Sequence, residues 1–137
     1  MVGLTSSTSR AQIVRATLEA ITYQVRDVLQ VIQASSNMDI TVLRADGGGA
    51  ANPFLMQFQA DILGIPVEVP GIAETTALGV AYLAGLAIGF WNRQQELSGQ
   101  WRLNASYEPR ISPTESDRLY SGWQRAMERA RDWEIPA

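Results

Sequence analysis

The sequence has no cysteine, no histidine and no lysine, and its 11 basic residues are all arginine. Without cysteine there is no disulfide, no thiolate nucleophile and no cysteine-ligated zinc site. Without histidine the chain lacks the imidazole base of a serine-type triad and the commonest metal ligand. Without lysine it has neither a Schiff-base amine nor the lysine of a P-loop. Any catalysis in which it takes part must therefore depend on carboxylates, backbone amides or residues of another chain.

What remains is the composition of a globular chain of one-domain length. It has 137 residues, of which 46% are hydrophobic and 18% charged. A protein that coats a nucleic-acid duplex needs positive charge to neutralise the phosphates, whereas this chain has a net charge of -3. We therefore expect no nucleic-acid partner. The first residues lack the cationic start and apolar core of a secretory signal. Together with the absence of cysteine, this favours a cytoplasmic protein.

The longest uncharged segment, Thr75–Asn92, has the appearance of a membrane span but is too short. Its apolar part, Ala77–Trp91, falls below the ~20 residues that a spanning helix needs. Gly79, Gly85 and Gly89 give it a surface of small residues suited to close packing. We therefore expect no membrane partner and interpret the segment as a helix buried against a sheet or another helix.

The first half of the chain predicts a helix, a strand and a second helix. A helix is expected from Ser9 to Gln33, with one apolar face formed by Val14, Leu18, Ile21, Val25, Val28 and Ile32. The run Ile40–Ala45 is apolar on both faces, as in a parallel strand covered by helices on either side. A second helix begins near Asn52 and is stopped by Gly64.

The second half predicts another strand and two further helices. Ile65–Pro70 is a short strand bounded by prolines, which favour a position near a sheet edge. A helix over Thr75–Phe90 follows, and Asn92–Arg110 is expected to be a loop with one hairpin-like or irregular stretch. The last helix begins with capping-box spacing at Ser112. One face of it carries Tyr120, Trp123, Met127 and Ala130, with Trp133 close by.

The resulting order, helix–strand–helix–strand–helix–helix, predicts an α/β layer with parallel pairing. Two strands are too few to cover three long apolar helix faces. The sheet is therefore expected to be incomplete. Either the chain assembles with a partner, as in a homo-oligomer, or part of its sheet is missing.

A glycine loop, DGGGAAN at Asp46–Asn52, lies where the first strand meets the second helix. The carboxyl ends of strands are the usual ligand crevice of open α/β sheets, and glycines there allow a backbone to approach a ribose or phosphate. The spacing matches neither a dinucleotide-binding fingerprint nor a P-loop. Tight-turn geometry and ligand binding both remain open, with the turn favoured. We interpret Asp46 as an acceptor for loop amides rather than a metal ligand.

Two long segments resemble the FGGY carbohydrate kinases. They are Leu43–Gly64 (LRADGGGAANPFLMQFQADILG) and Glu74–Trp91 (ETTALGVAYLAGLAIGFW). The spacing of Gly3–Glu19 is similar to the latter part of the second FGGY signature, and Tyr120–Trp133 is similar to the end of a glycerol kinase. The stretches MQFQ at 56–59 and GFW at 89–91 favour the glycerol kinase branch of the family.

This resemblance implies part of a ribonuclease-H-like lobe of the actin-like ATPase fold, in which two lobes close over ATP and magnesium. The segment matched is the end of the second lobe, which supplies the adenosine pocket. By motif position Gly48 and Asn52 are the nucleotide contacts, and Gly47 and Gly49 permit the close approach. Pro53 departs from the more usual polar residue, but its fixed φ suits a helix start.

The resemblance also implies that the reacting groups lie elsewhere. The family's phosphate loops, glycerol-binding residues, catalytic aspartate and most of its magnesium site precede the matched segment, and the opening residues of the signature should precede Gly3. We therefore expect residues 1–137 to be a C-terminal portion without the N-terminal lobe and the first strands of the second lobe. Such a portion has no catalytic or metal-binding residue and is inactive alone.

The function implied is the ATP-binding portion of a glycerol kinase, which transfers the γ-phosphoryl group of ATP in line to a primary hydroxyl of glycerol. The expected partners are ATP or ADP with magnesium and, through the missing lobe, glycerol. Two alternatives stay open. One is a non-catalytic interaction module that exposes apolar helix faces. The other is a portion of a different FGGY kinase, such as a xylulokinase, because the sugar pocket lies outside this segment.

Overall fold

The computed structural model describes residues 1–36, 38–72, 74–99 and 101–131. Five α-helices, one 3-10 helix and three strands lie within these ranges. In chain order they are α1 (Arg10–Ser36), β1 (Leu43–Arg44), η1 (Gly48–Ala51), α2 (Pro53–Leu63), β2 (Val67–Pro70), α3 (Thr75–Ala87), α4 (Gln95–Ser98), β3 (Leu103–Tyr107) and α5 (Pro113–Ala130). The predicted elements are present, although the first strand is much shorter than Ile40–Ala45.

The strands form a mixed sheet in the order β1-β2-β3 rather than a mainly parallel one. β1 pairs with β2 in parallel, and β2 pairs with β3 antiparallel. The prediction that Ile65–Pro70 lies near an edge is wrong, because β2 is the central strand of the described sheet. Its prolines sit at its two ends: the Pro66 carbonyl accepts from the Leu43 amide at 2.9 Å, and Pro70 lies at a register irregularity. Neither proline interrupts the ladder between them.

The third strand corrects the prediction of a loop over Asn92–Arg110. That segment contains α4 and the five residues of β3, Leu103–Tyr107. β3 reads LNASY and is exposed or half-buried along its length. Leu103, Ala105 and Tyr107 alternate with the polar Asn104 and Ser106, but only over five residues. Pairing with β2, which is a tertiary contact, is therefore what defines the strand.

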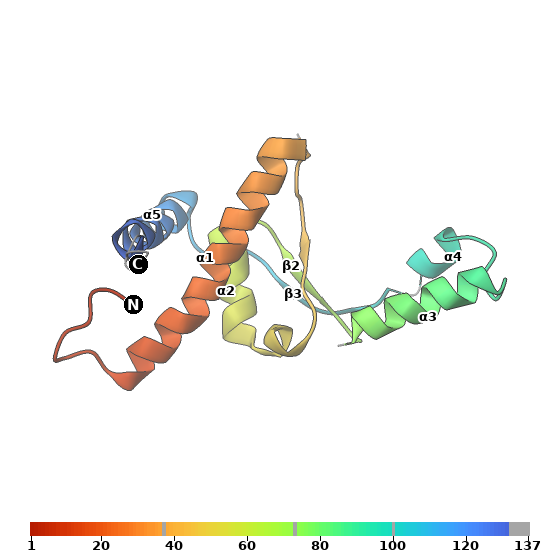
Figure 1. Cartoon of the computed structure of the whole chain (residues 1–137), viewed down its shortest axis with the longest axis horizontal. Coiled ribbons are helices and arrows are strands. Elements are labelled where there is room, and N and C mark those ends of the chain that lie inside the picture. The colour runs from red at the N-terminus through yellow and green to blue at the C-terminus, as the bar shows by residue number, and fades with distance from the viewer. Residues whose placement is uncertain (37, 73, 100, 132–137) are drawn as a thin grey trace, which may run out of the picture.

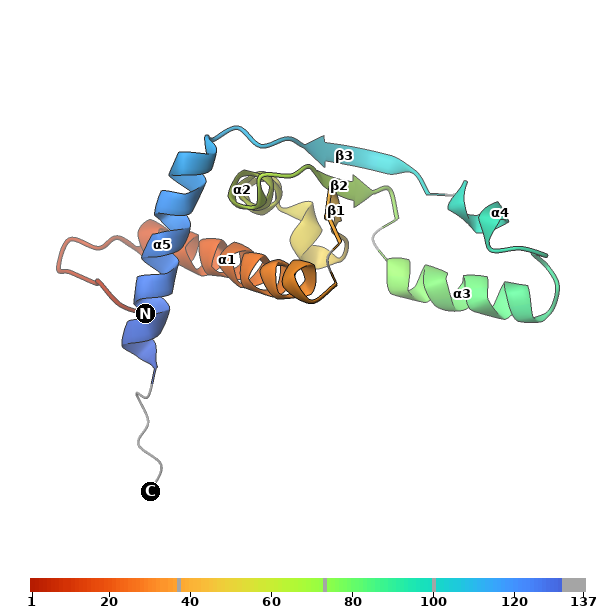
Figure 2. The same cartoon turned by 90° about the horizontal axis from the view of Figure 1, so that it is seen from above.

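Helix α2 lies between the sheet and the other core helices (Figures 1 and 2). One apolar cluster joins α2 to the sheet through Leu55, Met56, Ala60 and Val67. A second cluster joins the opposite face of α2 to α1 and α5, and its buried members are Tyr23, Phe58, Ile62 and Tyr120. Because α2 contributes to both clusters, it is the centre of the core.

The apolar face predicted for the first helix packs only in part. Leu18 and Val25 are half-buried, and Leu18 packs against the cluster between α2 and the sheet. Val14, Ile21, Val28 and Ile32 are 45–57% exposed, and the fully buried positions of α1 are Thr22 and Tyr23. The periodicity therefore identified an apolar stripe, most of which the described chain leaves uncovered.

The helix at Thr75–Ala87 is also exposed, in contrast to the buried helix that was expected. Within it only Gly85 is buried. α3 and α4 form an arm that extends away from α1, α2 and α5 in both views (Figures 1 and 2). The arm packs on itself, with Tyr82 and Trp91 in edge-to-face contact at 5.3 Å between ring centroids.

The last helix has the predicted start. Ser112 Oγ accepts from the Glu115 amide at 3.2 Å, and Pro113 occupies the first turn. Tyr120 is buried, whereas Met127 is 46% exposed and Ala130 is exposed. Trp133 lies outside the described residues. Trp123 Nε1 donates to Asp27 at 2.9 Å and so ties α5 to α1.

Gly64 ends α2 in a left-handed conformation with φ 70°. A Cβ in this region costs about 1 kcal/mol, so Gly64→Ala should lower the free energy of unfolding by that amount in a urea titration. Gly122→Ala is the matched control, since a Cβ inside α5 would meet no described atom within 4 Å. It should raise stability by ~0.5 kcal/mol. Equal effects of the two substitutions would contradict this assignment.

Burial raises the pKa of Tyr23 to about 12, and Glu19 adds to the effect. The folded state thus favours the neutral phenol, and this stability is complete below the unfolded pKa of ~10. It is lost as the pH rises toward 12, because the unfolded chain ionises first. The urea midpoint should therefore fall between about pH 10 and pH 12. Tyr23→Phe should show a shallower fall, and an equal fall in both chains would contradict the role of Tyr23.

Candidate functional site

The glycine loop lies at the carboxyl end of β1, as the sequence predicted. β1 ends at Arg44, η1 spans Gly48–Ala51, and α2 starts at Pro53. Parallel pairing of Leu43 with Val67 and of Arg44 with Glu68 brings the carboxyl ends of β1 and β2 together. The chain therefore turns from the sheet into the N-terminus of α2 at the edge where open α/β sheets bind ligands.

The three loop glycines have different physical requirements. Gly47 has φ 79° and ψ -173°, a region that essentially only glycine adopts. Gly48 has no positive φ, and a Cβ there would meet no described atom within 4 Å. A Cβ at Gly49 would make an ordinary 3.8 Å contact with Leu55. The backbone of the loop thus requires glycine at 47, whereas position 48 opens onto free space.

Asn52 caps the helix that follows the loop. Its Oδ1 accepts from the amides of Phe54 at 3.0 Å and Leu55 at 3.3 Å. Backbone amides only donate, so the side-chain orientation is fixed: oxygen toward the helix, and Nδ2 as the remaining donor. Among the described residues Nδ2 has no hydrogen-bond partner. The sequence identified Asn52 as a site residue but did not reveal this division of its two polar atoms.

A cavity of about 220 Å³ adjoins the loop. Asp46, Gly47 and Ala50 line it from the loop, and Val69, Asn104 and Tyr107 line it from β2 and β3. Gly48, Gly49 and Asn52 are not among its lining residues. The structure thus separates the predicted set: Gly47 lines the cavity, and the other three do not. Asn104 and Tyr107 were missed because β3 was predicted as loop.

Asp46 does not act as the loop acceptor that was expected. Its carboxylate is exposed and makes no side-chain hydrogen bond to a residue that the structure describes. Within the described ranges no three acidic side chains cluster as a metal site would require. Asp46 is thus a single free carboxylate beside the loop, which by itself is too few ligands for a protein-held divalent cation.

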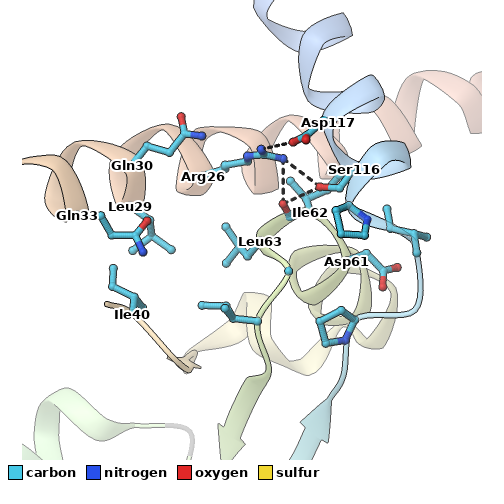
Figure 3. A pocket seen from close by; sticks show the side chains of 15 residues that line it. Arg26, Leu29, Gln30, Gln33, Ile40, Asp61, Ile62, Leu63, Ser116 and Asp117 are labelled. Carbon is cyan, nitrogen blue, oxygen red and sulfur yellow. Dashed lines mark hydrogen bonds and ion pairs between the residues drawn. The ribbon is translucent and has the colours of Figure 1, made fainter. Parts of the chain in front are cut away.

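A second cavity, of about 430 Å³, lies at the other end of α2 (Figure 3). Arg26 dominates it: Nη1 donates to the Ile62 carbonyl at 3.2 Å and to Ser116 Oγ at 3.0 Å, and Nη2 contacts Asp117 at 2.6 Å. Ser116 Oγ also donates to the Ile62 carbonyl at 2.9 Å. Because Arg26 and Ser116 are used in binding α1, α2 and α5 together, their role is structural and the glycine loop remains the candidate site.

None of the helices in the described ranges combines the length and apolarity needed to cross a lipid bilayer.

Fold and site together describe an α/β layer with a small cavity beside its glycine loop. The family is given by the sequence profile of the FGGY carbohydrate kinases, C-terminal domain, which matches residues 1–88. This chain belongs to the FGGY family of carbohydrate kinases. The resemblance inferred from the segments Leu43–Gly64 and Glu74–Trp91 is thereby confirmed.

The chain is similar to curated glycerol kinases over almost its whole length. The enzyme of Petrotoga mobilis is 58% identical over 97% of this chain, and that of Symbiobacterium thermophilum is 59% identical over the same share. In both cases the match covers 27% of the relative. The chain thus spans about a quarter of the length of the curated relatives it matches.

Solved structures give the same result. The Plasmodium falciparum glycerol kinase crystallised with ADP is 33% identical, with a TM-score of 0.83 over 99% of this chain and 27% of that chain. A xylulose kinase from Rhodospirillum rubrum matches with a TM-score of 0.73 at 24% identity, covering 93% of this chain and 26% of that chain. The second likeness concerns the fold alone. The actin-like ATPase assignment of the FGGY kinases therefore holds for this α/β chain.

The cap made by Asn52 gives a prediction about stability. Asn52→Ala removes the acceptor of two helix amides and should cost about 1 kcal/mol in urea unfolding. Asn52→Ser is the matched control, because a serine hydroxyl also caps a helix and should stay within about 0.3 kcal/mol of the parent. Equal stability of the two variants would show that Asn52 is not the cap.

Proposed function

We propose that this chain forms the adenosine-binding part of a glycerol kinase, which converts ATP and glycerol into ADP and glycerol 3-phosphate. The observation that carries the proposal is the glycine loop Gly47–Asn52 at the carboxyl edge of β1, in a chain 58% identical to a glycerol kinase. The ADP in the Plasmodium falciparum structure supports an adenine nucleotide as the ligand. The N-terminus of α2 adds the positive end of a helix dipole.

Each loop residue has a separate role in this proposal. The strained φ of Gly47 turns the chain out of the sheet, and Gly48 leaves the space through which the nucleoside approaches the backbone. Gly49 allows the short 3-10 turn to continue into the cap. Asn52, whose Oδ1 is used by α2, offers Nδ2 as a donor to an acceptor atom of the nucleotide.

We propose that the reacting groups come from the rest of the enzyme. A kinase of this type positions the γ-phosphoryl group in line with the acceptor hydroxyl and neutralises the developing charge, with an aspartate as base. Asp46 is the one free carboxylate beside the loop, and Mg²⁺ usually binds one or two carboxylates together with substrate phosphates. Magnesium is therefore held mainly outside this chain, where it neutralises phosphate charge.

The two alternatives have less support. The xylulose kinase likeness rests on 24% identity and carries only the fold, whereas the glycerol kinase relatives exceed 50% identity. A purely structural interaction module would not need the combination of an open Gly48 and an unpaired Asn52 donor beside a helix N-terminus.

The direct test supplies the part that this chain does not span. The chain is produced together with the remaining part of the Petrotoga mobilis enzyme, and ADP formation is followed by a coupled assay with and without glycerol. We expect glycerol-dependent turnover from the assembled parts and none from this chain alone. Turnover by the chain alone would contradict the assignment of the catalytic base to the other part.

Gly48→Ala tests the nucleotide site in the same assembly. The new methyl group fits the free loop, so stability should not change, but it occupies the space assigned to the nucleoside. The Kd for ATP should rise by about tenfold, equivalent to ~1.4 kcal/mol. Gly99→Ala is the matched control, another exposed glycine whose Cβ would meet nothing within 4 Å. Unchanged ATP affinity in Gly48→Ala would reject the assignment.

A further inference from the structure

Helix α3 has an apolar surface that this chain leaves uncovered. Its sequence, TTALGVAYLAGLA, contains no charged residue, and in the described structure only Gly85 is buried. Val80 and Leu83 are 64% and 69% exposed, and Ile88 and Phe90 just beyond the helix are 82% and 72% exposed. We call Val80, Ile88 and Phe90 the outer surface of α3. A helix that is apolar on all sides is normally found inside a protein or a membrane.

The inner side of α3 is already occupied. Trp91 lies against Gly85, where an added Cβ would clash with the indole ring. Leu78, Tyr82, Leu83 and Leu86 line a hollow together with Leu97 and Trp101. The arm therefore has a defined packed side, and the residues of the outer surface do not line this hollow.

A membrane is the wrong partner for this surface. The 13 residues of α3 extend about 20 Å, which is short of the ~30 Å hydrocarbon core of a bilayer. A simple pairing with a second copy is also unfavourable. One helix face ~20 Å long and ~10 Å wide offers roughly 200 Å², against the ~800 Å² per partner of a stable interface. A larger body that encloses the arm on several sides is needed.

The comparison with the whole kinase identifies such a body. The arrangement of this chain, arm included, matches the Plasmodium falciparum glycerol kinase with a TM-score of 0.83 over 99% of this chain. The same match covers only 27% of that chain. In that relative, therefore, a helix occupies the position of α3, and nearly three quarters of the relative's residues lie outside the matched part.

We propose that the outer surface of α3 docks onto the part of an FGGY kinase that this chain does not span. The inference rests on the proposed function and deepens it, because it names the surface through which the nucleotide-binding part joins the part that carries the reacting groups. Docking removes Val80, Ile88 and Phe90 from water, which is a favourable contribution to assembly.

The test uses the full chain co-produced with the remaining part of the Petrotoga mobilis enzyme. The double variant Val80→Glu/Ile88→Glu places two carboxylates on the outer surface without removing a buried contact. It should weaken assembly at least tenfold by affinity capture and light scattering. Met127→Glu on α5, another exposed apolar position, is the matched control and should assemble normally. Circular dichroism of each variant checks that the chain is folded.

Hydrogen exchange gives a second measurement that does not depend on affinity. In the chain alone, α3 amides should exchange faster than those of α2, because α3 lies outside the core. In the wild-type assembly α3 should become protected, and in the double variant it should not. Normal assembly of the double variant, equal weakening by Met127→Glu, or an α3 that stays unprotected in the wild-type assembly would each overturn the inference.

Failure of this inference and of the proposed function can be told apart. If the double variant assembles normally and the assembly phosphorylates glycerol, the docking surface is wrong and the function is right. If assembly occurs through α3 but the assembly neither binds ATP nor phosphorylates glycerol, the docking surface is right and the proposed function is wrong. If the wild-type chain does not assemble, the inference is wrong, and the function is then assayed with the two parts joined in one polypeptide.

Discussion

Helix α2 is held at both ends by side chains that bind its unsatisfied backbone groups, and the fold is organised around this restraint. At its N-terminus Asn52 Oδ1 accepts from the amides of Phe54 and Leu55. At its C-terminus Arg26 and Ser116 donate to the carbonyl of Ile62. Between these two points α2 contributes to both apolar clusters, one on the sheet and one on α1 and α5. The glycine loop is therefore attached to a helix that has little freedom to shift.

Local sequence signals predicted the structure correctly where a helix start or end depends on only a few neighbouring residues. Asn52-Pro53 and Gly64 bound α2 correctly, because a cap, a fixed φ and a left-handed end are properties of a few neighbouring residues. Signals that depend on distant partners failed. The apolar alternation of β3 covers only five residues, and the strand is defined by its pairing with β2. Likewise, nothing in the spacing of DGGGAAN indicates that Gly47 lines a cavity while Gly48 does not.

The two exposed apolar faces show a second limit of periodicity. The stripe of α1 that includes Val14 and Val28, and the outer surface of α3, were both expected to be buried. Periodicity reports which side of a helix avoids water but does not report whether the same chain supplies the cover. The packed face of α1 instead contains the polar residues Thr22 and Arg26, which an apolar pattern does not detect. An apolar helix face that the pattern predicts to be buried, but that this chain leaves exposed, therefore indicates a partner surface that covers it.

Asn52 links the stability of the fold to the proposed nucleotide site. Because its oxygen is fixed by two helix amides, Nδ2 needs no further ordering before it donates to a ligand, which lowers the entropic cost of binding. The same arrangement means that a substitution at position 52 changes both the helix and the site unless the replacement retains a capping oxygen. Serine retains the cap without the Nδ2 donor, so a loss of ATP affinity in a normally stable Asn52→Ser chain would separate the two roles. Rigidity of α2 is thus the physical basis on which this chain presents a nucleotide-binding loop.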